Sequence, residues 1–189
     1  GSSITVADAD GFVVNDGGTM KTIPATDITT YVGGGITAAS SWRLTTTFAD
    51  SATPIDSNWE ECDTQYSRIG SAMTESSGVF TYPSTGVWKI DFGCTLEAAS
   101  TTDYDIDVYI AGTTDAGSSW AEITRGKAYF ISPSGTAYKS TYCSGIQDIT
   151  NTTNCQTSFN VNGSSASINT KGDTAYNRTY VTFVRLGDT

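Results

Sequence analysis

Three aspartates at alternate positions, Asp103, Asp105 and Asp107, could bind a metal ion. If the segment is a strand, alternate side chains face one side, so the three carboxylates lie together. Calcium takes about six to eight oxygen ligands, so loop oxygens would have to complete the site. The spacing is not that of an EF-hand loop, because Val108 stands where that loop needs glycine. We therefore expect a solvated strand face and no cofactor, with calcium binding as the alternative.

The composition gives little support for catalysis. The sequence contains no histidine, which excludes Ser-His-Asp and Cys-His mechanisms and removes the commonest metal ligand. Paired carboxylates can hydrolyse glycosides, but nothing among the 20 acidic residues singles out a pair. We expect a protein that is not an enzyme.

The segment from Thr113 to Trp120 combines hydroxyl groups, a carboxylate and an aromatic ring. Such groups recognise sugars through hydrogen bonds and ring stacking, and Asp115 and Trp120 are the candidate ligand residues. Trp59 and Tyr66 could serve in the same way. For each of these aromatic rings we expect packing in the core, with ligand contact as the alternative.

Four cysteines lie far apart, without the Cys-x-x-Cys spacing of zinc sites. Cys94 is in phase with the apolar residues of a predicted strand and is expected to be a buried free thiol. Cys143 and Cys155 flank a predicted loop, and the sequence is consistent with either a disulfide between them or two free thiols. No role is assigned to Cys62.

The charge balance narrows the range of partners. Twenty acidic and ten basic residues give a formal net charge of −10, which would repel a phosphate backbone, so we expect no nucleic-acid partner. No apolar stretch approaches the roughly 20 residues that a membrane-spanning helix needs. We expect a soluble chain that does not insert into membranes.

The elements that position these residues are expected to be strands. Trp88, Ile90, Phe92, Cys94 and Leu96 alternate with polar residues, a pattern typical of a half-buried strand, and residues 104–110 repeat it. Further strands are predicted at residues 42–48, 80–82, 128–131, 138–143, 155–161, 166–170 and 176–186, separated by turn residues. Eight to ten short strands predict an all-β antiparallel sandwich or jelly roll.

The opening of the chain is different. Short β-prone runs flank Asn15-Asp16-Gly17-Gly18, which predicts a hairpin, and residues 25–32 predict a short helix. The predicted domains are an anchoring module at residues 1–32, a Gly-rich linker at 33–39 and a head at 40–189. A module this small cannot bury enough apolar surface to be stable alone, so we expect it to bind a partner. The predicted anchoring residues are Phe12, Val14, Ile23, Ile28 and Tyr31.

The last predicted strand is apolar on both faces. Tyr180, Val184 and Leu186 lie on one face, and Val181 and Phe183 lie on the other. We predict that a neighbouring subunit covers one of these faces, and we assign Tyr180, Val181 and Phe183 to a trimer interface. Cover by a loop of the same chain is the alternative.

Two pairs of segments resemble the complement-type and tumour-necrosis-factor-like trimeric jelly rolls. Gly78–Pro83 and Thr85–Ile90 are similar to the aromatic strand, the proline and the Gly-aromatic strand start of that family. The Gly172-Asp173 turn and the final strand at Tyr180–Val184 also resemble it. The resemblance extends from Ser40 to the end and implies a jelly-roll head that assembles as a homotrimer.

The opening module resembles small modules in the fibre and appendage proteins of tailed bacteriophages. The resemblance lies in Asp10–Tyr31, where Asp-x-Phe-x-x-x-Asp-Gly-Gly-Thr is followed by Lys-x-Ile and a short helix. It implies a non-enzymatic structural protein of the virion surface, assembled in the host cytoplasm. The protein would be a tail fibre or receptor-binding appendage, or a capsid decoration (head-fibre) protein.

The resemblance also implies partners. Other virion proteins would bind the module, and a host surface glycan or receptor would bind the head. The alternative function is a secreted or cell-surface carbohydrate-binding module or adhesin, and a hydrolase ranks third.

Overall fold

The computed structural model describes residues 6–7, 9–31, 35–63, 68–98, 104–131, 135–163 and 167–189. The chain divides into two compact units, Gly1–Gly35 and Ile36–Thr189. The second unit, the head, includes residues that we assigned to the linker. Ala38 is buried, and its carbonyl accepts a hydrogen bond from the backbone N–H of Arg185 at 2.9 Å. The head therefore begins before Ser40.

The opening unit contains the expected hairpin and short helix. Strands β1 (Gly11–Asp16) and β2 (Thr19–Pro24) pair antiparallel, and helix α1 (Ala25–Tyr31) follows at once. Gly17 and Gly18 form the turn with φ of 59° and 92°, a region of backbone conformation that favours glycine.

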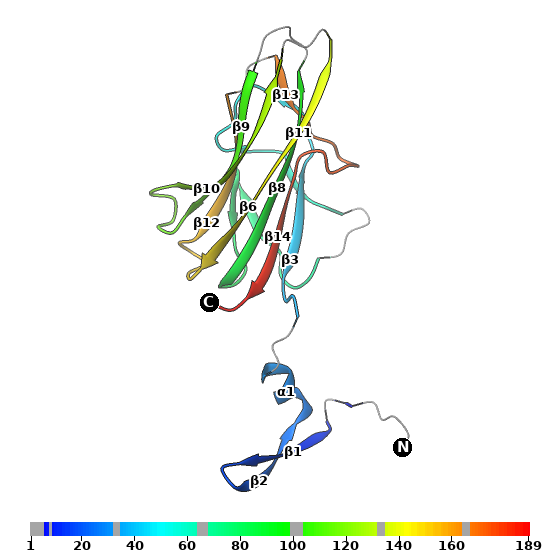
Figure 1. The fold of residues 1–189 in the computed structure, drawn as a ribbon, viewed down its shortest axis with the longest axis vertical. Coiled ribbons are helices and arrows are strands. Elements are labelled where there is room, and N and C mark those ends of the chain that lie inside the picture. The colour runs from blue at the N-terminus through cyan, green and yellow to red at the C-terminus, as the bar shows by residue number, and fades with distance from the viewer. Residues whose placement is uncertain are drawn as a thin grey trace. The chain divides into compact units, whose positions relative to one another are not determined.

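The head is built from antiparallel strands in two sheets. Within the described residues, one sheet has five strands in the order β10-β9-β12-β7-β6. The other has seven, in the order β4-β13-β8-β14-β3-β5, with β11 paired to the opposite edge of β8. In Figure 1, β11, β8, β14 and β3 run side by side. The strands are β3 (Ala39–Leu44), β4 (Phe48–Ala49), β5 (Trp59–Glu61), β6 (Thr74–Ser76), β7 (Val79–Thr81), β8 (Gly86–Ala98), β9 (Tyr104–Thr113), β10 (Ala121–Phe130), β11 (Ala137–Ile149), β12 (Gln156–Asn162), β13 (Ile168–Thr170) and β14 (Tyr180–Gly187).

An aromatic cluster fills the space between the two sheets. The ring of Phe80 lies 5.3 Å from the rings of both Phe159 and Phe183, measured between centroids, and Phe92 lies 5.2 Å from Phe159. The alternating residues of β8 from Trp88 to Leu96 are fully buried against this cluster, as their pattern predicted. The antiparallel sandwich is thus confirmed, and burial of this apolar surface is its main source of stability.

Two strands extend beyond the residues predicted for them. The inward-facing positions of the extra residues are small or polar, so the sequence showed no apolar alternation there. Strand β10 was predicted only from Ala128, but it begins at Ala121, and Thr124 and Gly126 interrupt its apolar pattern. Strand β11 continues past Cys143 to Ile149 because it pairs with β8 along its whole length. Cross-strand pairing thus formed strands where the local pattern was weak.

Helices contribute little to the fold. In the part of the chain that the structure describes, no helix is long and apolar enough to cross a membrane.

Candidate functional site

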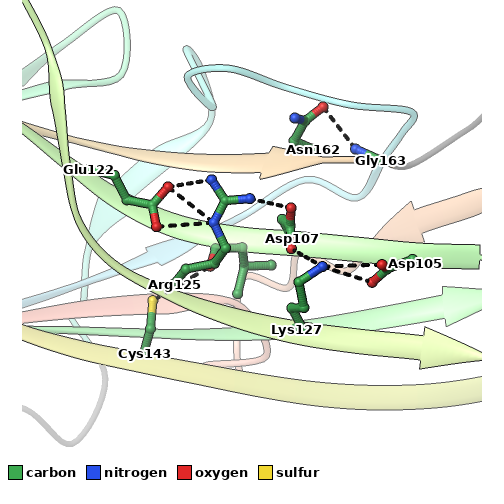
Figure 2. Close-up of polar contacts among 9 residues, drawn as sticks. Asp105, Asp107, Glu122, Arg125, Lys127, Cys143, Asn162 and Gly163 are labelled. Carbon is green, nitrogen blue, oxygen red and sulfur yellow. Dashed lines mark hydrogen bonds and ion pairs between the residues drawn. The ribbon is translucent and has the colours of Figure 1, made fainter.

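A ladder of ion pairs runs along the outer face of strands β9 and β10 (Figure 2). The ammonium of Lys127 lies 3.1 Å from a carboxylate oxygen of Asp105 and 3.0 Å from one of Asp107. The guanidinium of Arg125 bridges Asp107 and Glu122, with its Nε 3.0 Å from both oxygens of Glu122. Hydrogen bonds from Arg125 lower the pKa of Glu122. The hydrogen bonds that Lys127 itself donates to Asp107 and Asp105 raise the pKa of Lys127.

This ladder shows what stabilises the aspartates of the predicted solvated face. Asp105 and Asp107 do lie on one strand face, but two cations of the neighbouring strand neutralise them. The antiparallel register, which places Lys127 opposite Asp107, creates this arrangement. Asp103 lies outside the described residues. Among the described residues, no group of three or more acidic or cysteine side chains is placed to hold a metal ion.

The loop between β9 and β10 is organised by Asp115. Its carboxylate accepts hydrogen bonds from the hydroxyl of Thr113 at 2.6 Å and from the backbone N–H of Ser119 at 2.9 Å. The hydroxyl of Ser119 also donates to it, at 2.5 Å. Hydrogen bonds from Ser119 and Thr113 lower the pKa of Asp115 to about 2. Asp115 therefore shapes the loop, and of the two candidate ligand residues Trp120 is the one that borders a hollow.

The hollow lies on the outer face of the five-stranded sheet and has a volume of about 570 Å³. Strand register explains its shape, because Ser158 of β12 lies opposite Ala111 of β9, and Ala111 lies opposite Glu122 of β10. The small side chains of Ala111 and Ser158 thus form the floor of the hollow, between larger neighbouring side chains. Tyr109 and Trp120 also line it.

Of the other two candidate sugar-binding aromatics, Trp59 does not line this hollow. Trp59 is a core residue, and its indole N–H donates to the carbonyl of Ile55 at 2.9 Å. The packing expected for Trp59 is therefore what the structure shows. Tyr66 lies outside the described residues.

The outer face of the seven-stranded sheet corrects the assignment of the last strand. Val181 and Phe183 are 0% exposed and belong to the core of a single chain, so a second copy cannot reach their side chains. Of the three predicted interface residues, only Tyr180 lies on the outer face, where its ring covers Gly93 of β8. Sequence alternation separated the two faces of β14 but could not tell which one faced the core.

This outer face carries exposed apolar side chains, of which the sequence analysis selected Leu186 but not Tyr142 or Ile146. Tyr142 and Ile146 of β11 and Leu186 of β14 are each more than half exposed. The polar groups between them are paired, since Asp91 accepts hydrogen bonds from Lys89 and from the hydroxyl of Tyr142. Burial alone would raise the pKa of Asp91, but these hydrogen bonds outweigh it and lower the pKa.

The predicted anchoring residues are only partly covered within the opening unit. Phe12 is exposed, while Val14, Ile23 and Ile28 are half-buried. Tyr31 ends α1, but its side chain lies outside the described residues. Val13 and Met20, which the sequence analysis did not select, are more than half exposed on the opposite face of the hairpin.

Each of the four cysteines, all of which the structure describes, is buried with a free thiol. The sulfur of Cys143 lies 3.8 Å from the carbonyl oxygen of Val108, and that of Cys155 lies 4.0 Å from the hydroxyl of Thr150. The alternative of a Cys143–Cys155 disulfide is therefore not realised. The buried free thiol expected at Cys94 is confirmed, and burial raises its pKa to about 12.

Comparison with known proteins establishes the fold. No protein-family description and no curated protein matches the sequence. A crystal structure of murine APRIL at pH 5.0 aligns with a TM-score of 0.58 over 79% of this chain and 98% of that chain, at 13% identity. A structure of Eiger TNF from S. frugiperda aligns with a TM-score of 0.59 over 80% of this chain and 93% of that chain, at 11% identity.

The head has a TNF-like fold. This confirms the jelly-roll architecture that segments such as Gly78–Pro83 indicated. At these identities the likeness extends to the fold alone. The resemblance of the opening module to phage modules stays a prediction.

Proposed function

We propose that this protein is a homotrimeric, non-enzymatic structural protein of the surface of a tailed-phage particle. In this proposal the opening module binds another virion protein and the TNF-like head faces outward. The head belongs either to a fibre or receptor-binding appendage or to a capsid decoration protein, assembled in the host cytoplasm. A TNF-like fold suggests a homotrimer and is generally non-enzymatic, which agrees with the absence of histidine from the sequence.

The exposed apolar row on the seven-stranded sheet carries the trimer part of the proposal. Tyr142, Ile146 and Leu186 lie on the outer face of β11 and β14, and the half-buried Val184 lies on the same face. Exposed apolar patches of this kind mark protein–protein contacts. The intervening Lys89–Asp91 pair is already neutralised, with an ammonium to carboxylate distance of 2.5 Å, so covering it leaves no single unpaired charge. Two further copies of the chain are the proposed cover.

The opening hairpin supports a separate docking role. Apolar side chains occur on both of its faces, with Phe12 and Val14 on one and Val13 and Met20 on the other. A two-stranded hairpin with one short helix is too small to cover both faces. A groove or sheet edge of another virion protein would complete its core.

The alternative function is a secreted or cell-surface carbohydrate-binding module or adhesin. The hollow beside Trp120 favours it, because an exposed indole next to hydrogen-bonding groups suits sugars. The two functions differ in the role of residues 1–35, which the alternative does not need.

Light scattering on the full chain tests the trimer. We expect the wild-type protein to have the mass of a trimer, three times the chain mass of 19.9 kDa. The variant Ile146→Asp should have the mass of a monomer. Ile131→Asp is the matched control, because Ile131 is also highly exposed but follows β10 of the other sheet, and this variant should remain trimeric. A monomeric wild-type protein at high concentration would contradict the proposal.

Electron microscopy of particles tests the docking part. Particles assembled with Met20→Asp should lack the head density, while the exposed-residue control Thr26→Asp should keep it. Normal incorporation of a chain that lacks residues 1–35 would refute the role of the module.

A further inference from the structure

We infer that the hollow on the five-stranded sheet is a binding site for a neutral sugar, formed by Tyr109, Trp120, Ser158 and Asn160 over the small side chain of Ala111. This inference rests on the proposed function for the biological source of the sugar, a glycan of the host surface. The physical argument for the site itself depends only on the head.

The floor of the hollow presents buried polar groups with spare hydrogen-bonding capacity. Ser158 and Asn160 are each only 4% exposed, yet both lie on the outer face of β12 and line the hollow. The amide nitrogen of Asn160 donates only long hydrogen bonds of 3.4 Å, to the carbonyl of Tyr109 and to Ser158. Its amide oxygen accepts no hydrogen bond from any residue that the structure describes. Because the hollow is open to solvent, water meets this oxygen in the free protein, and a ligand hydroxyl can take the place of that water.

The walls supply aromatic surface. Trp120 is 39% exposed at the end of the β9–β10 loop, so one part of its indole is free to pack on a ligand. Tyr109 is held in place from the next strand, because the guanidinium of Arg125 lies 5.0 Å from the centre of its ring. The ring of Tyr109 is therefore fixed by a neighbour, and Trp120 adds a partly exposed ring to the same hollow. Aromatic rings beside amide and hydroxyl groups suit a sugar ring, which has apolar C–H faces and a hydroxyl rim.

The charges around the hollow select a neutral ligand. No lysine or arginine is among the described residues that line it, and its one charged lining residue is Glu122. The nearby Arg125 is already engaged by Glu122 and Asp107, as Figure 2 shows. An acidic sugar or a phosphate would therefore meet a carboxylate without a free cation. The polar floor in turn disfavours a purely apolar ligand.

The volume fits a small part of a glycan. About 570 Å³ lies within the usual range for small-molecule sites, and the hollow is open to solvent on the outer side of the sheet. A mono- or disaccharide at the end of a longer chain would fill it while the rest of the glycan stayed in water.

Saturation-transfer NMR on the full chain tests the site. The probes are the methyl glycosides of glucose, galactose, mannose and N-acetylglucosamine, each at millimolar concentration. We expect saturation transfer to at least one probe, a loss of affinity of about tenfold in Trp120→Ala, and no detectable binding in Ala111→Leu, whose side chain fills the floor. The control Tyr176→Ala removes a more exposed ring that does not line the hollow, and this variant should bind as the wild-type protein does.

Two results would overturn the inference. One is the absence of saturation transfer with every probe, and the other is binding that persists in both Trp120→Ala and Ala111→Leu. Thermal melting of each variant checks that it is folded, and Trp120→Ala removes an exposed side chain, so it remains informative if Ala111→Leu unfolds. Light scattering on the same samples reports the trimer independently, so a monomeric chain that binds sugar would refute the proposed function and leave this site intact.

Discussion

Replacing Phe183 by alanine tests whether β14 contributes its aromatic ring to the core of one chain or to a contact between copies. The ring is completely buried, and its centroid lies 5.3 Å from that of Phe80, 5.8 Å from that of Phe159 and 6.0 Å from that of Tyr82. Truncation therefore removes a full ring's buried surface and leaves a cavity among side chains that cannot all move inward. Such Phe→Ala changes cost about 3 to 5 kcal/mol of unfolding free energy.

The assay is urea unfolding of the full chain at one fixed protein concentration, followed by tryptophan fluorescence. With a denaturant slope of about 2 kcal/mol per molar urea, a loss of about 4 kcal/mol moves the midpoint down by about 2 M. Tyr176→Ala is the control, because its ring is highly exposed, and it should change the free energy of unfolding by no more than about 0.5 kcal/mol. At urea concentrations too low to unfold them, the wild-type protein and both variants should have the same mass by light scattering.

The opposite pattern would refute the core assignment. If Phe183→Ala lowered the unfolding free energy by less than about 1 kcal/mol but reduced the mass by light scattering, the ring would belong to an interface after all.

Three further predictions concern single side chains. Burial raises the pKa of Cys94 to about 12 and that of Cys143 to about 11. Both thiols should therefore resist alkylation at pH 8 until urea unfolds the chain. Rapid alkylation of the folded protein would show instead that the thiols are accessible. Because the folded pKa of Asp115 lies below its ordinary value of 3.8, its contribution to stability is present above pH 3.8 and is lost as the pH falls through about 2. The amide resonance of Ser119 should therefore titrate near pH 2, and a midpoint near 4 would mean that the loop hydrogen bonds do not form. Lys127→Ala removes the ion pairs to Asp105 and Asp107. Because Lys127 and Asp105 are both more than half exposed and Arg125 still pairs with Asp107, thermal unfolding should show only a small loss of stability that shrinks in high salt, and a large, salt-independent loss would indicate a packing role instead.

Local patterns were sufficient for elements whose own residues specify them. The stripe from Trp88 to Leu96 could be predicted because strand side chains alternate with a period of two, and all of its members are buried. The opening hairpin could be predicted because Gly17 and Gly18 can adopt the positive φ that its turn needs. In both cases the information lies within a few consecutive residues.

The candidate site could not be predicted in the same way, because its residues come from different strands. Trp120 was selected from its loop, but Tyr109, Ser158 and Asn160 carry no local signal of a ligand site. They become neighbours only through the pairing of β9 with β12. Asp115 was selected with Trp120, yet its hydrogen bonds commit it to the structure of the loop.

The sequence by itself determined the all-β class, the separate hairpin and the lack of histidine chemistry, because composition and short-range alternation are properties of the chain alone. Only the tertiary structure decided which face of β14 is inside, which cations neutralise Asp105 and Asp107, and where a hollow forms. These features depend on the register between strands that are distant in sequence. Register is set by the packing of the whole sandwich, so no single segment encodes it.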